Sequence, residues 1–237
     1  MNEKRYLEIR KEVFEKIYKN NAEKQQLEAE VIMVQGKLDR KMKTFNKIKD
    51  IKETQMLRGL ILETYNLSIL KKKNLIREKE MYSLRLQSYM RCIISLSKHD
   101  HIEYSSNKKE FVEELKRQAI EKIDLDVSII RQKRLTYNKM NAYLDAVKGK
   151  TGANFFENKD GLITREEIDS DNMKQFDLEE EKRYMINAFE NEEYELGDDR
   201  IEGDQKLCDN SPVDAIRSIY PKFRDTMLSI EEGKKRK

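Results

Sequence analysis

The sequence predicts an all-α protein: an elongated coiled coil with an antiparallel helical hairpin, followed by an acidic, partly disordered tail with short helices. Of the 237 residues 39% are charged and none is Trp, whereas an average chain is about 25% charged. Such a chain has much surface and little core. Its two prolines, Pro212 and Pro221, lie near the C-terminus. Apolar residues recur at alternating four- and three-residue steps, which is the heptad pattern of coiled coils.

Residues 1–52 form the predicted N-terminal coiled-coil segment. Its heptad seam starts at Tyr6, and Lys, Glu and Gln fill the turns between the apolar members. Asn20 and Lys24 interrupt the seam; they either fix its register, as buried polar groups do in coiled coils, or mark a weak end of the coil. The seam residues expected to bind a partner helix are Val13, Ile17, Leu27, Val31, Val34, Leu38, Phe45 and Ile48.

Residues 53–148 form the predicted helical hairpin, with its joint near 99–107. The heptad phase changes around Gly59, which predicts a bend or a flexible point there. Asn107 and Glu110 have the spacing of a capping box, so we expect the second helix to begin directly after Asn107. The short joint allows this helix to fold back antiparallel on the preceding one.

The predicted hairpin leaves residues 6–48 without an intramolecular partner. An isolated amphipathic helix exposes its apolar seam to water, so we expect this segment to pair with another chain. Another coiled-coil protein is favoured over a second copy of this chain, because the flanking charges are mixed and Lys41 occupies a seam position.

An acidic linker at 149–211, with one short helix, and a C-terminal amphipathic segment at 212–232 complete the predicted fold. Ser211 and Pro212 form a strong helix start, and Pro221 should bend or split the helix that follows. The segment either docks into a groove of another protein or packs back on its own hairpin. Its apolar face comprises Val213, Ile216, Tyr220, Phe223, Met227 and Ile230.

The charge is unevenly distributed along the chain. Residues 1–150 carry 34 basic and 22 acidic residues, whereas residues 151–237 carry 14 and 23. The acidic part either solubilises the chain, folds back on the basic helices or binds a basic partner. The chain ends in a basic tail, 233–237, that is either a nuclear import signal or an ordinary solvated end. The candidate signal is Lys234, Lys235, Arg236 and Lys237.

The cysteines and the hydropathy pattern indicate a compartment. Two cysteines without a Cys-x-x-Cys pair fit a reducing environment and provide no zinc motif. No apolar run approaches the roughly 18 residues of a membrane span, and the N-terminus lacks the apolar stretch of a signal peptide. We therefore expect a soluble intracellular protein without membrane contact, in the nucleus rather than the cytoplasm.

One stretch of the acidic part resembles the loop of a calcium-binding EF-hand. Its first ligand position, however, is Phe156, whose ring cannot bind a hard cation. Thr164 as N-cap and Glu167 three residues later explain the same pattern as a helix start. We therefore expect no metal at the lookalike residues, which are Asn158, Asp160, Thr164 and Glu167.

No nucleophile motif, phosphate-binding glycine loop or cofactor motif occurs in the sequence, so we expect no enzyme activity and no cofactor. The leading hypothesis is a non-enzymatic coiled-coil subunit, acting as spacer or scaffold in a multi-protein assembly such as a nuclear chromosome-segregation or chromatin complex. A cytoplasmic cytoskeletal or vesicle-tethering coiled coil is the alternative. A nucleic-acid-binding helical rod is a second alternative, not favoured because the lysines at 71–73 are interspersed with acids around the helix.

Overall fold

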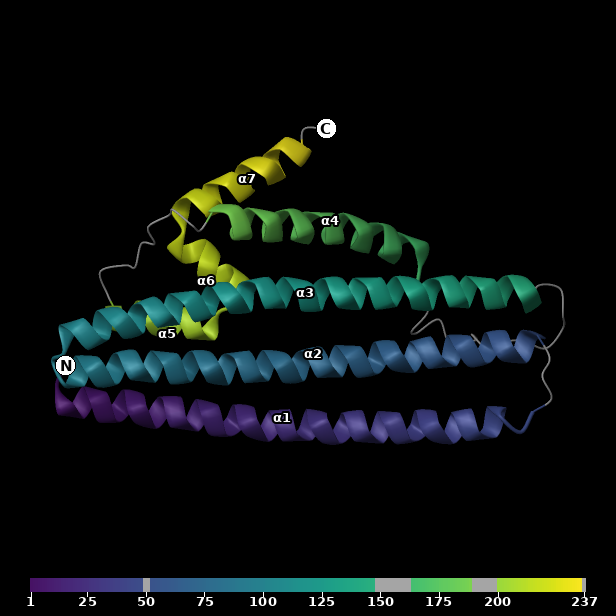
Figure 1. The fold of residues 1–237 in the computed structure, drawn as a ribbon, viewed down its shortest axis with the longest axis horizontal. Helices are drawn as coiled ribbons and strands as arrows, with labels where there is room; N and C mark the ends of the chain where they lie inside the picture. Colours follow the sequence, from purple (N-terminus) through teal and green to yellow (C-terminus); the bar gives the residue numbers. More distant parts are fainter. Residues whose placement is uncertain (49–51, 148–162, 189–199, 236–237) are drawn as a thin grey trace. The chain divides into compact units, whose positions relative to one another are not determined.

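A computed structural model describes residues 1–48, 52–147, 163–188 and 200–235 of the chain. Every regular element within these ranges is a helix, and no strand occurs among them. The prediction of an all-α protein is therefore confirmed. The helices, labelled in Figure 1, are α1 (Glu3–Phe45), α2 (Lys52–Ser97), α3 (His101–Val147), α4 (Arg165–Ala188), α5 (Arg200–Asp209), α6 (Pro212–Ile219) and α7 (Pro221–Lys235).

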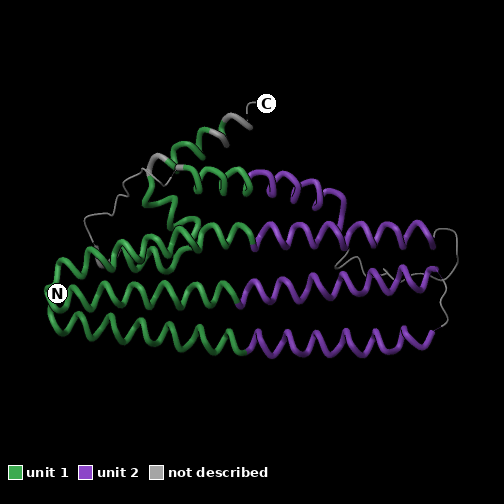
Figure 2. Tube along the Cα trace, in the orientation of Figure 1, with its two compact units in different colours: residues 1–25, 77–124, 178–237 green, residues 26–76, 125–177 purple. Residues whose placement is uncertain are grey.

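The chain divides into two compact units, each built from parts of the same long helices (Figure 2). Unit 1 comprises residues 1–25, 77–124 and 178–237, and unit 2 comprises residues 26–76 and 125–177. Unit 1 thus contains the N-terminal part of α1, the joint between α2 and α3, and all of α5, α6 and α7.

The predicted antiparallel hairpin is confirmed in α2 and α3. Within unit 1 the Gln118 amide donates to the Met81 carbonyl at 3.1 Å, and within unit 2 the Asn74 amide donates to the Leu125 carbonyl at 2.9 Å. Within unit 1 the Asn107 amide also donates to the Ser95 hydroxyl at 2.7 Å, and within unit 2 the Gln132 amide donates to the Glu63 carboxylate at 2.8 Å. In each unit the residue numbers of the contacting pairs therefore rise on one helix as they fall on the other, which is the register of antiparallel helices.

The hairpin joint is shorter than the sequence suggested, because α3 begins at His101. His99 has a φ of 58°, and the Asp100 N–H donates to the Ser95 carbonyl at 3.0 Å, which closes α2 in a Schellman-type turn. The Asp100 carboxylate then accepts the Glu103 N–H at 2.9 Å and caps α3. Asn107, expected to be the cap, lies inside α3 because Asp100 already supplies the acceptor.

Helix α1 has partners within its own chain. In unit 1 the Asn20 amide donates to the Lys79 carbonyl at 2.6 Å and to the Ser83 hydroxyl at 2.8 Å. In unit 2 Lys72 forms an ion pair with Glu30. The expectation that residues 6–48 lack an intramolecular partner is therefore wrong.

The reason lies in the position of the helix break. Helix α1 ends at Phe45 and α2 begins at Lys52, so the two are separate helices. Within unit 1 the Met1 amino group lies 3.5 Å from the Leu96 carbonyl and Asn20 contacts Lys79, so α2 runs antiparallel to α1. Gly59, where a bend was expected, lies inside α2, consistent with the modest cost of about 1 kcal/mol for Gly in a helix interior.

The core of unit 1 combines the hairpin with helices from the end of the chain. The Tyr184 and Phe223 rings stack with their centroids 5.3 Å apart, which joins α4 to α7. Aromatic pairs of this kind add to the free energy gained by burial. The side chains with no exposed area are Tyr89, Phe111, Val112, Leu115, Ala119, Ile123, Cys208, Ala215, Ile216, Tyr220 and Phe223, together with the polar Ser95 and Gln118.

The core of unit 2 centres on Leu60, Met140 and Tyr143 of α2 and α3. Met56, Leu57, Tyr137 and Val147 pack against these three residues. The first half of α4 is held to α3 by polar contacts, of which Lys133 to Asp171 at 2.8 Å is one.

The acidic segment holds more helix than the single short one expected for 149–211. Both α4 and α5 lie in that range. The capping box at the start of α4 is confirmed: the Glu167 N–H donates to the Thr164 hydroxyl at 3.2 Å, and the Thr164 N–H donates to the Glu167 carboxylate at 2.9 Å. Tertiary contacts such as Lys182 to Asp124 at 2.5 Å then retain α4 despite its high charge.

The C-terminal helix start and break also agree with the sequence. Ser211 is the N-cap of α6 and accepts the Asp214 N–H at 3.2 Å, with Pro212 at the first helical position. The predicted split occurs at Pro221, where α7 begins directly after Tyr220.

Candidate functional site

Two features of unit 1 qualify as functional surfaces: an exposed apolar line on α1 and a cavity. The line consists of Leu7, Phe14 and Tyr18, which we call the α1 outer face. Their exposed fractions are 51%, 56% and 80%. Steps of seven and four residues place all three on one side of a helix.

Basic side chains border the α1 outer face. The Arg10 guanidinium lies 5.6 Å from the centroid of the Phe14 ring, a distance at which cation and ring attract each other. Lys4 and Lys11 lie within one helical turn of Leu7, and both are exposed. This edge of the face would therefore attract acidic side chains of a partner.

The opposite side of α1 is buried. Ile9 and Val13 each expose only 2% of their area, because they face the interior of unit 1. Helix α1 thus has two apolar sides, one covered by its own chain and one in water. Exposed apolar side chains that recur along one side of a helix are candidates for an interaction surface.

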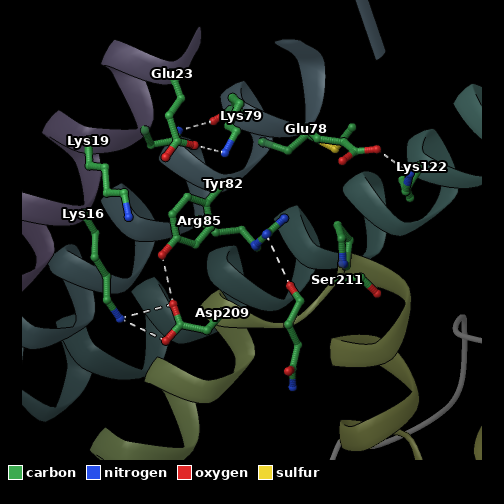
Figure 3. A pocket seen from close by; sticks show the side chains of 14 residues that line it. Lys16, Lys19, Glu23, Glu78, Lys79, Tyr82, Arg85, Lys122, Asp209 and Ser211 are labelled. Atoms are coloured by element: carbon green, nitrogen blue, oxygen red, sulfur yellow. Dashed lines mark hydrogen bonds and ion pairs between the residues drawn. The ribbon is translucent and has the colours of Figure 1, made fainter. Parts of the chain in front are cut away.

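The cavity has a volume of about 460 Å³ and is lined by α1, α2, α3 and the joint between α5 and α6 (Figure 3). Its lining includes five cationic side chains and three carboxylates. The cations are Lys16, Lys19, Lys79, Arg85 and Lys122, and the carboxylates are Glu23, Glu78 and Asp209.

Each carboxylate of the cavity has a lysine partner within the lining. The Lys16 ammonium lies 2.9 Å from Asp209, Lys122 lies 2.5 Å from Glu78, and Lys79 pairs with Glu23. The hydrogen bond from Lys79 lowers the pKa of Glu23 below its ordinary value. These three ion pairs largely neutralise the charge of Lys16, Lys79 and Lys122.

Tyr82 closes the Asp209 side of the cavity. Its hydroxyl donates to the Asp209 carboxylate at 2.9 Å. Burial, followed by the hydrogen bond to Asp209, raises the pKa of Tyr82 to about 12. The phenol therefore stays protonated and acts as a fixed donor to Asp209.

Arg85 differs from the lysines because its bonds go to neutral acceptors. It donates to the Gln118 side-chain oxygen at 2.7 Å and to the backbone carbonyls of Cys208 and Asn210, each at 3.3 Å. Only 5% of Arg85 is exposed, and this burial lowers the pKa of its guanidinium. Arg85 is thus a buried cation without a carboxylate partner among the described residues.

The residues predicted to bind a partner lie mainly on the inner side of α1. Val13 and Leu38 are buried, and Ile17, Leu27, Val31, Val34 and Phe45 are half-buried. Only Ile48, beyond the end of α1, is largely exposed, at 48%. These residues offer a partner less apolar surface than the α1 outer face does.

The predicted docking segment contributes to the core of unit 1. Ile216, Tyr220 and Phe223 are completely buried, and Val213 and Met227 are half-buried. Lys116 of α3 lies 5.5 Å from the centroid of the Tyr220 ring. The segment thus packs back on its own chain in this structure, and docking elsewhere would require these side chains to leave unit 1.

The remaining predicted sites are only partly described. Asn158 and Asp160 lie outside the described residues, whereas Thr164 and Glu167 form the α4 capping box. Lys234 and Lys235 belong to α7, but their side chains are not described, and residues 236–237 lie outside the described ranges.

The sequence did contain a signal for the α1 outer face. Leu7, Phe14 and Tyr18 repeat at heptad-like steps beside the seam that starts at Tyr6, so α1 carries two apolar stripes rather than one. The cavity had no comparable signal. Its residues come from separate helices, and only the tertiary structure brings Lys19 and Arg85 to one site.

Comparison of the chain with known protein families, with curated proteins and with solved structures found no match. Among the residues that the structure describes, no group of three or more His, Cys, Asp or Glu side chains is arranged to hold a metal ion. No helix in the same ranges is long and apolar enough to cross a bilayer.

Proposed function

We propose that the chain is a non-enzymatic subunit of a multi-protein assembly, and that its α1 outer face binds a helix of another protein. The observation that carries the proposal is the line formed by Leu7, Phe14 and Tyr18. Each of these side chains leaves half or more of its area in water, although the other side of the same helix is buried.

The spacing of the face specifies a helical partner. Apolar residues at steps of seven and four form the stripe that one helix presents to another in coiled coils and bundles. Ala22 continues the stripe by one more turn, is exposed, and would let a second helix approach closely. Phe14 and Tyr18 are large anchors of the type that contributes most binding free energy at interfaces.

The charges beside the face favour a different protein over a second copy of this chain. Basic residues outnumber acidic ones along the edge of the face, with Lys4, Arg10 and Lys11 against Glu3 and Glu15. Two copies would therefore bring net positive charge together, which opposes binding. We infer a partner helix with apolar residues at three- and four-residue steps and acidic residues beside them. This partner is a coiled-coil protein, as the sequence suggested, but it binds another side of α1.

A cross-linking experiment tests the proposed interface. A photo-reactive phenylalanine analogue is placed at Phe14 or Tyr18 of the full chain in its native cells, and at Lys109 of α3 as an exposed control position. We expect one other protein to be captured from positions 14 and 18, and not from 109. The same protein, purified, should then bind the wild-type chain directly.

Binding of the purified pair is then measured for a variant of the face. The double substitution Phe14→Glu and Tyr18→Glu should weaken binding at least about thirtyfold, because loss of an anchor at an interface costs about 2 kcal/mol or more. Circular dichroism should show unchanged helix content, since both residues are exposed. Unchanged affinity, or cross-links only between copies of this chain, would contradict the proposed interface.

The nuclear setting, in a chromosome-segregation or chromatin complex, is part of the same proposal and has the basic end of the chain as its support. Deleting residues 234–237 from a fluorescent fusion should reduce its nuclear fraction if these residues are an import signal. A fusion that is cytoplasmic with and without them would favour the cytoskeletal or tethering alternative.

A further inference from the structure

The cavity of unit 1 has a surplus of positive charge that its own carboxylates do not neutralise. Lys16, Lys79 and Lys122 have carboxylate partners within the lining. Lys19 and Arg85 are the two cations that remain. Both line the same cavity of about 460 Å³, which lies in the size range of small-molecule sites in proteins.

Lys19 has no hydrogen bond or ion pair with any described residue. Its charge contributes to the lowered pKa of Glu23, but the Glu23 carboxylate is held by Lys79. In Figure 3 the Lys19 side chain extends from α1 into the space beside Tyr82. An ammonium group in that position can contact a ligand without first giving up a protein partner.

Arg85 has a structural role as well as a surplus charge. Its bonds to Cys208 and Asn210 place it at the C-terminal end of α5, where a cation is favoured by the helix dipole. Arginine has five N–H groups, and Arg85 donates one bond each through Nε, Nη1 and Nη2. Two of the five N–H groups therefore remain for an anion that accepts through two oxygens, such as phosphate.

The neutral walls of the cavity suggest what else the ligand contains. Met81, Tyr82 and Pro212 contribute apolar surface to the lining. Asn20 and Ser211 are polar, but both are engaged within the protein: Asn20 with Lys79 and Ser83, and Ser211 with Asp214. A ligand that is anionic at one end and apolar or aromatic at the other would fit this distribution.

We propose that this cavity binds a small phosphate-bearing molecule of about mononucleotide size, with Lys19 and Arg85 as the groups that bind the phosphate. The buried charge of Arg85 favours such a ligand, because an anion offsets the cost of desolvating the guanidinium. The phosphate enters from the Lys19 side, and the rest of the molecule lies against Tyr82 and Pro212. This site is separate from the α1 outer face and does not depend on it.

Titration calorimetry of the full chain at physiological salt tests the proposal. The probes are adenosine 5′-monophosphate, inorganic pyrophosphate and inorganic phosphate, with adenosine as the uncharged control. We expect the nucleotide and pyrophosphate to bind and adenosine not to bind. Hydrogen exchange should show protection by the nucleotide at the joint between α5 and α6, residues 207–212, as a second readout.

A matched pair of variants distinguishes binding in the cavity from nonspecific electrostatic binding to the basic surface of the protein. Lys19→Gln should weaken nucleotide binding about fivefold or more, because a hydrogen bond to a charged group is lost. Lys109→Gln removes an equal charge from an exposed position on α3 outside the cavity and should leave the affinity unchanged. Lys19 is also exposed, so unchanged circular dichroism is expected for both variants.

Three results would overturn the proposal. The first is the absence of binding by any phosphate probe up to about 10 mM, which corresponds to less than about 3 kcal/mol of binding free energy. The second is an equal loss of affinity in the Lys19 and Lys109 variants, which would indicate nonspecific attraction. The third is binding without protection at residues 207–212, which would place the ligand elsewhere.

Discussion

Unit 1 and unit 2 are built from the same three long helices but differ in how deeply their cores are buried. In unit 1, eleven apolar side chains have no exposed area, Phe111 and Tyr220 among them. In unit 2 every buried apolar side chain retains some exposure, from 4% at Leu38 to 8% at Ile69. The apolar faces of the three long helices are therefore not enough by themselves to bury a side chain completely.

The difference arises from the end of the chain. Unit 1 includes α5, α6 and α7, whose residues Cys208, Ile216 and Phe223 are completely buried. In unit 2 only the first half of α4 is added to the long helices. The C-terminal helices therefore complete a core that the long helices alone leave open, and both candidate surfaces of the protein lie in the unit that they complete.

Removing an anchor of α7 should have the largest effect. Phe223→Ala deletes a completely buried ring that stacks on Tyr184, and should lower the free energy of unfolding of unit 1 by about 4 kcal/mol. Phe176→Ala, in unit 2, is the matched control because Phe176 is 53% exposed. Urea unfolding followed by circular dichroism measures both variants.

The region in which the Phe223 variant loses protection is as informative as its loss of unfolding free energy. Hydrogen exchange should accelerate in residues 101–124 of the Phe223 variant, because α3 loses its cover there. If hydrogen exchange in that range and the urea unfolding of the variant both matched the wild-type chain, the C-terminal helices would not be what distinguishes the two cores.

A smaller loss of unfolding free energy is expected when either of two isoleucines on α3 is shortened to valine. Ile123 lies in unit 1 with no exposed area, and Ile130, two helical turns further along, lies in unit 2 with 5% exposed. Ile123→Val should cost about 1.5 kcal/mol and Ile130→Val about 0.5 kcal/mol, the two ends of the usual range for this substitution. Equal losses in urea unfolding would show that both cores are equally well packed.

The sequence predicted local structure better than it predicted packing. The capping box at Thr164, the N-cap at Ser211 and the split at Pro221 depend on residues a few positions apart, and all three were found as expected. The partner of α1 depends on how the chain reverses after Phe45. A phase change in the heptads indicates that the continuous coiled coil is interrupted there, but a bend within one helix and a reversal between two helices produce the same pattern.

The candidate site likewise depends on packing that the sequence does not predict. Each stripe on α1 can be read from the sequence, yet only the packing shows that Val13 faces inward and Tyr18 faces water. The charge surplus of the cavity depends on which acid pairs with which base. Asp209 follows Lys16 by 193 residues and still neutralises it at 2.9 Å, a pairing that no local rule predicts.

The smallest expected effect concerns the dependence of stability on pH. In unit 1 Arg77 binds Glu121 through two hydrogen bonds, of 2.5 and 3.0 Å, and these lower the pKa of Glu121 below its ordinary value of 4.5. A carboxylate with a lowered pKa in the folded state contributes stability above its unfolded pKa, and that contribution is lost as the pH falls through the folded pKa. In unit 2 the bond from Lys72 lowers the pKa of Glu30 in the same direction.

Arg77→Gln should therefore destabilise unit 1 at pH 6 but not at a pH below the folded pKa of Glu121, where the wild-type chain has also lost the ion pair. The loss at pH 6 should stay below about 1 kcal/mol, because the pair is partly exposed and screened by solvent. Lys72→Gln, the counterpart in unit 2, should change the pH dependence less, since an ammonium makes one bond where the guanidinium makes two. Urea unfolding at both pH values measures these differences. A pH-independent loss in the Arg77 variant would mean that its side chain stabilises unit 1 by packing along α2 rather than by its charge.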